Sequence, residues 1–236
     1  MEFAGRSVVL TGVGREGQVG EAVAQAFAEH GARVFLVDRL DTDARARAEA
    51  LVAKGLRAAS LAADLTDVGA TSTLAERVRE ATAGRLTALV HLAGGFASSG
   101  PVAESDPAIW QRQFAINATT AYLTARALLP LLRAGKGSIV FFASEAVLTG
   151  ARVAELSAYV AAKSAVVALM HAIAQEEKSH GVRANAVAPT AIRTADNVAA
   201  MGADAPMVSR EAVADVVLWL CSDAARAVSG QVIPVR

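Results

Sequence analysis

The sequence predicts an α/β protein with a single parallel sheet, and three features of the chain support this. Short apolar runs rich in branched residues recur from end to end, longer helical patterns lie between them, and the connections are short. Strand–helix alternation with short loops requires right-handed crossovers and a parallel sheet covered by helices on both faces. The 236 residues contain no linker, low-complexity segment or internal repeat. We therefore expect one doubly wound, Rossmann-type domain over residues 1–236, with about seven strands.

Candidate strands are short and apolar, whereas candidate helices have apolar positions at helical intervals. The strands are expected at Ser7–Thr11, Arg33–Val37, Arg57–Leu61 (the weakest), Leu86–Leu92, Ser138–Phe142, Arg183–Val187 and Gly230–Val235. The helices are expected near 19–30, 43–54, 68–82, 106–132, 157–179 and 210–222. Gly31 and Gly181 follow two of these helical patterns, as C-terminal glycines do, and Asp106–Pro107 is typical of an N-cap followed by proline. Because ligands of such sheets bind at the carboxyl ends of the strands, the residues just after each strand are the candidates for a site.

Composition argues against several classes of function. The chain has 23 basic and 23 acidic residues and no formal net charge, which gives no electrostatic reason to expect nucleic acid or an anionic membrane as partner. No apolar run approaches ~18 residues, and the start lacks the pattern of a signal peptide. Cys221 is the only cysteine, so no internal disulfide can form, and the histidines show no metal-ligand spacing with it or with acids. We therefore expect a cytoplasmic protein without a metal site and without a membrane span.

A glycine-rich loop follows the first strand. Gly12, Gly14, Gly17 and Gly20 occur in the stretch GVGREGQVG, directly before a helical pattern. Glycine lets the backbone turn sharply and approach a phosphate, and the free N–H groups of the following helix favour a pyrophosphate. The loop predicts a dinucleotide site, the alternative being a flexible turn that only needs glycine.

Asp38 ends the second strand and is the candidate ligand of a ribose. It follows Gly20 by 18 positions, close to the ~20-residue spacing expected of a carboxylate that holds ribose hydroxyls. A 2′-phosphate ~4 Å away would be repelled by ~4 kcal/mol at an effective dielectric of about 20. NAD is therefore expected over NADP, although Arg15 or Arg39 could offset the repulsion. The alternative for Asp38 is a helix N-cap or a solvated loop acid.

With these features in place, the chain resembles the classical short-chain dehydrogenases/reductases from about Gly5 to its end. The landmarks of that family occur here in order and at family-like spacings: Thr11–Gly12, Asp38, Asp64–Leu65, Ala93–Gly94, Asn117, Ser144, Tyr159, Lys163 and Pro189. One such motif would carry little weight, because Tyr-x-x-x-Lys places two side chains on one face of many ordinary helices. The full set in order makes the resemblance specific.

The resemblance implies a role for each of these residues. Tyr159 would be the general acid/base, Ser144 would hydrogen-bond the substrate oxygen, and Lys163 would hold the nicotinamide ribose and favour the tyrosinate. Asn117 would anchor a water that passes protons to solvent. A tyrosine pKa near 10 would have to fall to about 7, which requires ~4 kcal/mol of preferential stabilisation of the anion. The further cofactor contacts implied are Asp64 and Leu65 beside the adenine, Ala93, Gly94 and Pro189 at strand ends, and Thr194 against the nicotinamide amide or a phosphate.

The chain departs from the family pattern at four places. The glycine loop is two residues longer than usual, and Gln18 stands where the middle glycine would align. His91–Leu92 replaces the first two residues of the usual Asn-Asn-Ala-Gly, so His91 is expected to take over structural hydrogen bonds. Thr190 stands where glycine is common, and the Asp-Gly-Gly often found after the last strand is missing.

Three functions remain open from the sequence. The first is an oxidoreductase that transfers a hydride between a nicotinamide cofactor and a secondary alcohol or ketone, with residues 190–209 as a short substrate lid. The second is a cofactor-binding regulator without turnover, which the irregular glycine loop favours and the intact catalytic set disfavours. The third is an NADP-dependent reductase of the 3-oxoacyl-thioester type. By resemblance, the long helices at 106–132 and 157–179 would build a homotetramer or homodimer.

Overall fold

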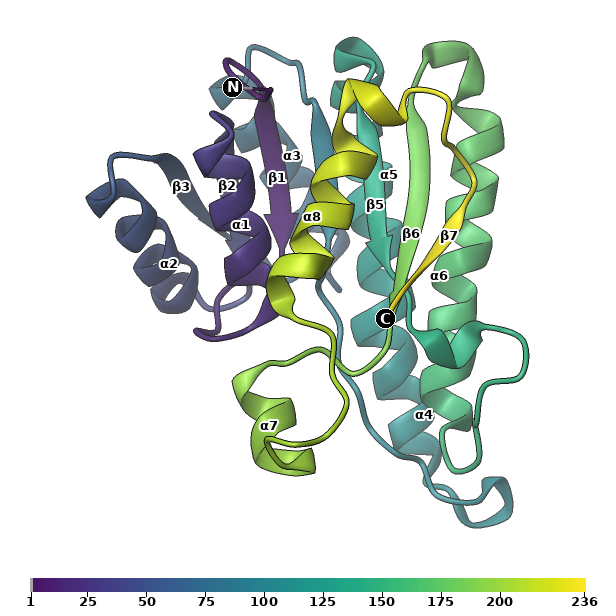
Figure 1. Ribbon diagram of the computed structural model, residues 1–236. Coiled ribbons are helices and arrows are strands. Elements are labelled where there is room, and N and C mark those ends of the chain that lie inside the picture. Colours follow the sequence, from purple (N-terminus) through teal and green to yellow (C-terminus); the bar gives the residue numbers. More distant parts are fainter. Residues whose placement is uncertain (1) are drawn as a thin grey trace.

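Seven parallel strands form the centre of the protein (Figure 1). The structure, a computed structural model, describes residues 2–236. The strands are β1 (Ser7–Thr11), β2 (Arg33–Asp38), β3 (Arg57–Ala62), β4 (Ala88–His91), β5 (Ser138–Phe142), β6 (Arg183–Pro189) and β7 (Val232–Val235). Their order across the sheet is β3-β2-β1-β4-β5-β6-β7, and every neighbouring pair is parallel. The predicted doubly wound fold and its expected strands are confirmed.

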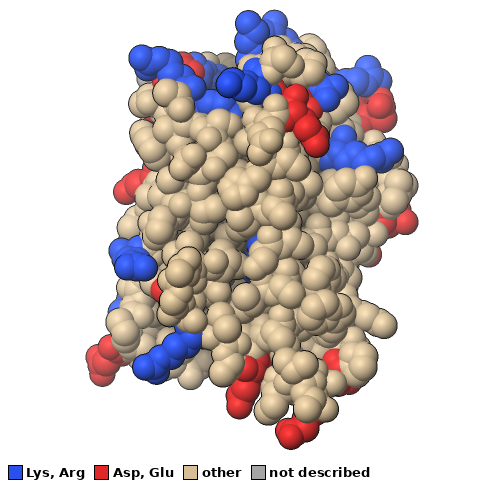
Figure 2. All heavy atoms as spheres, turned by 90° about the vertical axis from the view of Figure 1, so that its right-hand side faces the viewer, with Lys and Arg blue, Asp and Glu red and all other residues tan. Residues whose placement is uncertain are grey.

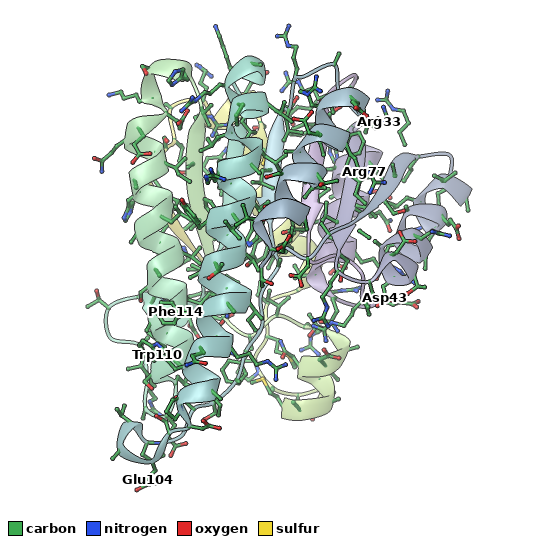
Figure 3. The ribbon with its side chains drawn as sticks, turned by 180° about the vertical axis from the view of Figure 1, so that it is seen from behind. Arg33, Asp43, Arg77, Glu104, Trp110 and Phe114 are labelled. Atoms are coloured by element: carbon green, nitrogen blue, oxygen red, sulfur yellow. The ribbon has the colours of Figure 1, made fainter. Side chains whose placement is uncertain are left out.

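Two layers of helices cover the sheet. The longer helices are α1 (Val19–Glu29), α2 (Asp41–Ala53), α3 (Val68–Ala81), α5 (Thr120–Gly135), α6 (Ser157–Glu176) and α8 (Arg210–Cys221). Apolar residues of α1, α2 and α8 bury one face, and those of α3, α5 and α6 bury the other, which faces the viewer in Figure 3. Short helical turns occupy Val102–Glu104 (η1), Glu145–Val147 (η3), Lys178–His180 (η4) and Asp223–Ala225 (η5).

Successive strand residues point into opposite layers, as the two-residue period of a strand requires. In β1, Val8 and Leu10 pack with α1 and α8, whereas Val9 packs with the opposite layer. Every strand but the outer ones is therefore buried on both faces, which explains the unbroken apolar runs in the sequence. The crossovers change direction between β1 and β4, and a ligand crevice is expected at that point.

The helix predicted over 106–132 is divided into three parts. Helix α4 (Pro107–Gln113) starts at the expected N-cap, because the Asp106 carboxylate accepts a hydrogen bond from the Ala108 N–H. A π-helical turn, η2 (Phe114–Thr119), then joins it to α5. Polar side chains compete for the backbone there: Asn117 Nδ2 donates to the Gln113 carbonyl and Thr120 Oγ1 to the Ile116 carbonyl. Periodicity alone could not predict this wider turn.

Helix α6 is long and apolar enough to pass a composition test for a membrane-spanning helix, contrary to the expectation from apolar runs. Its inner side packs on the sheet through Val166, Met170 and Ile173, and Lys163 is buried there as well. The same helix is partly apolar on its outer side. We attribute its high hydropathy to the side that packs on the sheet rather than to a membrane span.

The segment expected as a lid contains a further helix, α7 (Ala195–Met201). Thr194 forms its N-cap by accepting a hydrogen bond from the Asn197 N–H. A single bridge between Ile192 and Val208 closes the base of this segment. Helix α7 thus projects below the carboxyl ends of the strands in Figure 1.

Candidate active site

A cleft of about 800 Å³ opens at the carboxyl ends of β4, β5 and β6. It is lined by five of the residues singled out in the sequence: Gly94, Ser144, Tyr159, Lys163 and Pro189. These residues come from three strand ends and from the first turns of α6, so the parallel topology brings them to one edge of the sheet. Asn117 lies beside the cleft without lining it, and the residues of the glycine loop lie outside it.

Lys163 lies one turn after Tyr159 on α6, and its side chain is only 6% exposed. Its Nζ donates to the Phe142 carbonyl at 2.8 Å and lies 6.0 Å from the centre of the Tyr159 ring. Burial lowers the pKa of Lys163 to about 8. The amine is thus charged at neutral pH and fixed to the end of β5, with further N–H donors to offer into the cleft.

The Tyr159 side chain lies beside Ser144 and packs against an aromatic neighbour. Burial raises its pKa above the ordinary value, whereas the hydrogen bond with the Ser144 side chain lowers it. Phe96 packs edge-on against the Tyr159 ring at a centroid distance of 5.1 Å. Within the protein alone the desolvation effect is the larger one, so the pKa of Tyr159 is raised in the absence of the cofactor.

Asn117 fixes the loop after β4 with its side chain. Its Oδ1 accepts from the Gly95 N–H at 3.2 Å, and its Nδ2 donates to the Gly95 carbonyl at 3.0 Å. The loop passes so close that a Cβ on Gly94 would lie 2.5 Å from Asn117 Oδ1 and 3.3 Å from Lys163 Nζ. The side chain of Asn117 is therefore committed to the loop, and its carbonyl accepts a hydrogen bond from Thr120 Oγ1, so the water-anchoring role stays a prediction.

His91 joins three elements beneath the cleft. Its Nδ1 lies 3.1 Å from Thr11 Oγ1 at the end of β1, and its Nε2 lies 3.3 Å from Thr120 Oγ1 at the start of α5. Thr11 Oγ1 also accepts from the Ala93 N–H. Burial first, and Lys163 second, lower the pKa of His91 to about 3, so the ring is neutral at physiological pH. The structural role expected for His91 is consistent with these contacts.

The glycine loop approaches the neighbouring strand end very closely. At Gly12, where φ is +72°, a Cβ would lie 2.7 Å from the backbone of Ala93, so only glycine fits. The Gly14 N–H donates to Asp38 Oδ2 at 2.9 Å, and the Arg39 N–H donates to Asp38 Oδ1 at 2.8 Å. Asp38 is not the N-cap of α2, whose N-cap residue is Leu40. Its carboxylate is instead fixed beside the loop, as a ribose ligand would be.

The loop leads into α1 as a phosphate cradle should. Within residues 2–236, no side chain caps the N-terminus of α1 at Gln18, so its first N–H groups remain available to an anion. Gly17 and Gly20 flank that end, and the Gly17 N–H donates to Glu21 Oε2 at 2.9 Å. The close backbone approach, the uncapped helix and the fixed Asp38 together fit a dinucleotide.

The segment that contains α7 contacts the glycine loop directly. Arg15 pairs with Asp196 of α7 at 2.5 Å, and the Ala195 N–H donates to the Gly17 carbonyl at 3.4 Å. Thr194 is 6% exposed and lies at this junction. Arg15 is therefore neutralised by a lid carboxylate rather than directed toward Asp38.

Two predicted adenine contacts lie apart from the cleft, beyond β3. Asp64 is exposed and its Oδ1 accepts from both the N–H and the hydroxyl of Thr66, which lowers the pKa of the carboxyl group. Leu65 is 6% exposed and packs in the core.

The cleft also contains residues that the sequence did not single out. They include Phe96, Leu148, Arg152, Ile192 and Asn197. Phe96 and Ile192 follow strand ends, and that position alone could have indicated them. Arg152 lies in a long loop, and no sequence pattern points to it. Among residues 2–236, no three His, Cys, Asp or Glu side chains are grouped to hold a metal.

Comparison with known proteins decides the family. Residues 12–236 match the sequence family described as enoyl-(acyl carrier protein) reductase. The chain is a classical short-chain dehydrogenase/reductase. It is 36% identical to 2-(S)-hydroxypropyl-CoM dehydrogenase 3 of Xanthobacter autotrophicus, over 97% of this chain and 94% of that protein. It is 35% identical to cis-4-hydroxycyclohexanecarboxylate dehydrogenase of Sinomonas cyclohexanicum, over 99% of this chain and 96% of that protein.

A solved member of the same family has the same fold. The crystal structure of a 3-oxoacyl-[acyl-carrier protein] reductase from Brucella melitensis with bound NAD superposes with a TM-score of 0.86. The two are 32% identical, and the match covers 99% of this chain and 90% of that one. This short-chain dehydrogenase/reductase is therefore an NAD(P)-dependent oxidoreductase, and the expected family and enzyme class are confirmed.

Proposed function

We propose that this enzyme interconverts a secondary alcohol and a ketone with NAD(H), using Tyr159 as general acid/base. One observation supports this above the others: Ser144, Tyr159 and Lys163 converge on one cleft at the crevice of the sheet, where the dinucleotide loop also ends. Two relatives have names that describe a secondary alcohol, a 2-hydroxypropyl group in one and a 4-hydroxycyclohexane ring in the other. The same type of substrate is proposed here.

Each side chain of the cleft would have one task. Ser144 holds the substrate oxygen by a hydrogen bond, and Tyr159 gives that oxygen a proton during reduction or takes it during oxidation. Lys163, fixed to the Phe142 carbonyl, would offer its remaining N–H donors to the nicotinamide ribose and would favour the tyrosinate by its charge. Asn117 fixes the loop of Gly94 and Gly95, which would border the nicotinamide. The bound nicotinamide supplies the hydride.

The residues of the glycine loop would hold the rest of the cofactor. Gly12, Gly14, Gly17 and Gly20 surround the uncapped end of α1, which suits the pyrophosphate. Asp38 would accept hydrogen bonds from the ribose hydroxyls. Ala93, Pro189 and Thr194 lie at strand ends or at the lid junction, where they would contact the nicotinamide half, and Asp64 and Leu65 remain the proposed neighbours of the adenine.

NAD is proposed over NADP because the structure leaves the Asp38 carboxylate unopposed on its ribose side. Arg15, one of two arginines that could offset it, pairs with Asp196. Arg39 is exposed and forms no ion pair with Asp38; only its backbone N–H donates to that carboxylate. An NADP-dependent 3-oxoacyl reductase remains the second candidate, since the Brucella structure is named as a 3-oxoacyl reductase.

Further assignments are also proposals. Residues 190–209 would act as a lid through α7, within a single catalytic domain that spans 1–236. The enzyme would work in the cytoplasm as a homotetramer or homodimer, with no nucleic acid or membrane as partner. A cofactor-binding regulator without turnover is the alternative, and the buried Lys163 and the Ser144–Tyr159 hydrogen bond argue against it.

Replacing Tyr159 with phenylalanine tests the function directly. Tyr159→Phe keeps the ring and its contact with Phe96 but removes the proton donor. Because proton transfer typically contributes ~10²–10⁴-fold, turnover of ketones with NADH should fall at least ~100-fold. The measurement is NADH oxidation across a panel of ketones, with NADH affinity from fluorescence titration as the control for folding. Equal turnover of the two proteins would contradict the role of Tyr159, and no turnover by the wild type across the panel would favour the regulator.

A further inference from the structure

The loop between η3 and α6 forms one wall of the catalytic cleft. Residues 148–156, called the wall segment below, follow η3 and lead into α6. Helix α6 starts at Ser157, two residues before Tyr159. The segment is visible in Figure 1 as the loop between η3 and the lower end of α6. Its members that line the cleft are Leu148, Thr149, Gly150, Ala151, Arg152 and Leu156. Whatever enters the cleft therefore meets this segment.

The end of the wall segment is fixed to the loop after β4. The Glu155 carbonyl accepts three hydrogen bonds, from Ser98 Oγ at 3.0 Å, from the Ser99 N–H at 2.8 Å and from Ser99 Oγ at 3.1 Å. Ser99 Oγ also lies 3.1 Å from Ser157 Oγ at the start of α6. Ser99 is 7% exposed, so its bonds are partly shielded from water, whereas Ser98 is exposed. The two loops that flank the cleft are thus joined at one backbone carbonyl.

Glu155 adopts a backbone conformation that its residue type disfavours. Its φ is +63°, in the left-handed region where non-glycine residues are uncommon. Its side chain is exposed and makes no ion pair or hydrogen bond within residues 2–236. The carbonyl bonds therefore hold the strained conformation, and such strain is often found where a functional loop must follow a set path.

Arg152 is carried on this fixed segment with its guanidinium unengaged. It lines the cleft and is exposed, and in the described part of the chain it forms no ion pair and no hydrogen bond. Arg15 and Arg133, in contrast, each pair with a carboxylate. Glu145 also lines the cleft but is not within ion-pair distance of Arg152. A guanidinium offers five N–H donors in a planar fork that matches a carboxylate.

The rest of the cleft suits a small substrate with one charged end. Phe96, Leu148 and Met201 supply apolar surface, and Phe96 and Met201 are 66% and 52% exposed. The N-terminus of α6, a helix of 20 residues, adds a partial positive charge at this edge. Lys163 and Arg236 also line the cleft, and the Lys163 amine is bonded to the Phe142 carbonyl at the proposed catalytic centre. Arg152, carried on the wall segment, is thus one lining cation that is available to a second, remote group.

We propose that Arg152 anchors a carboxylate or similar anion on the substrate, at the end remote from the reacting carbon, and that the Ser99–Glu155 bonds hold it in place. The inference rests on the proposed function, because it assigns specificity at the same cleft. The substrate class is then a short hydroxy acid or keto acid whose hydrocarbon part lies on the apolar wall.

A matched pair of ketones tests this assignment. The probes are 4-oxocyclohexanecarboxylate and 4-methylcyclohexanone, which share a ring and differ in the charged group. The wild type should show a KM at least tenfold lower for the keto acid. Arg152→Gln should raise that KM about tenfold, which corresponds to ~1.4 kcal/mol, and Arg152→Lys should restore part of the preference. Arg77→Gln is the control, because Arg77 is exposed on α3 (Figure 3) and does not line the cleft. This variant should leave the ratio of the two ketones' KM values unchanged.

The outcomes separate this inference from the proposed function. An unchanged KM ratio in Arg152→Gln, with both ketones reduced, would overturn the anchor and leave the oxidoreductase intact. If the wild type reduced neither ketone, calorimetric binding of cyclohexanecarboxylate to the enzyme–NADH complex would decide: weaker binding to Arg152→Gln supports the anchor, and equal binding refutes it. A failure of the proposed function would instead appear as a Tyr159→Phe variant that is as active as the wild type.

Two further variants test whether the wall segment positions Arg152. Ser99→Ala removes the hydroxyl bonds and should raise the KM of the keto acid severalfold, while NADH affinity stays unchanged. Glu155→Gly keeps the carbonyl and suits the positive φ, so it should retain the preference for the acid. A Ser99→Ala variant with the wild-type KM ratio would show that the bonds to Glu155 do not position the arginine.

Discussion

At the scale of single residues, His91 is the clearest departure from the family pattern. An imidazole replaces an amide, yet it spans Thr11 and Thr120 with both ring nitrogens and is 2% exposed. A neutral ring can donate from one nitrogen and accept at the other, whereas a protonated ring can only donate. Charging His91 would therefore leave the bond from Thr11 without an acceptor, in a site that already buries Lys163.

This contact set predicts an acid-sensitive contribution to stability. The pKa of His91 is lowered from 6.5 to about 3, so folding is favoured fully above pH 6.5 and loses this contribution as the pH falls toward 3. Each unit of pH within that window corresponds to up to ~1.4 kcal/mol. Between pH 6.5 and pH 5 the wild type should lose about 2 kcal/mol more than His91→Asn, as measured by urea unfolding. Equal losses in both proteins would show that His91 is not held neutral.

At the scale of elements, the junction between the glycine loop and α7 bears on cofactor choice. The Arg15–Asp196 pair is exposed, so its own contribution to stability is small. The pair matters more for the charge around Asp38, because it holds the Arg15 guanidinium at Asp196 of α7 and away from the Asp38 carboxylate. A longer glycine loop than usual thus reaches α7 and contacts it at Gly17.

Releasing Arg15 should weaken the preference for NAD. We expect the wild type to bind NADH at least ~10-fold more tightly than NADPH, a difference of ~1.4 kcal/mol that lies well within the Coulomb repulsion from Asp38. Asp196→Asn frees Arg15 and should narrow the ratio of the NADH and NADPH affinities. Asp204 lies in the same segment and forms no ion pair in the described part of the chain, so Asp204→Asn should leave that ratio unchanged. Fluorescence titration with the two dinucleotides measures both. Tighter binding of NADPH by the wild type would contradict the assignment.

At the scale of the whole molecule, charge is distributed by the direction of the helices. Helices that return against a parallel sheet place their C-termini at the amino ends of the strands, and Lys136, Lys178 and Arg226 lie at that end. These cations complement the negative ends of the helix dipoles. Their clustering is therefore explained without a bound anionic ligand. Figure 2 shows basic side chains at the top of the molecule and few charges over the middle of the face that contains α6.

That uncharged face is the proposed contact between subunits. The outer side of α6 is partly apolar, with Ala168 and Ala172 exposed beside Ser164 and His171, and Tyr122 on the adjacent α5 is 51% exposed. Sedimentation should give two or four times the mass of the chain. Ala168→Glu, which adds a charge to an exposed position of α6, should shift the protein toward the monomer, while Ser72→Glu on α3 should not. A wild-type monomer at micromolar concentration would contradict the proposal.

The sequence by itself determined the fold and the family, and it predicted the side chains proposed as catalytic. Buried strands must be apolar on both faces, and Gly12 lies where only a missing side chain fits, so local patterns suffice for these features. The tertiary structure decided what depends on distant partners. It committed the Asn117 side chain to Gly95, paired Arg15 with Asp196, and brought Arg152 to the cleft on a carbonyl held by Ser99. These contacts join residues 22 to 181 positions apart. No pattern in one sequence predicts them, because they depend on how the elements pack and not on local residue order.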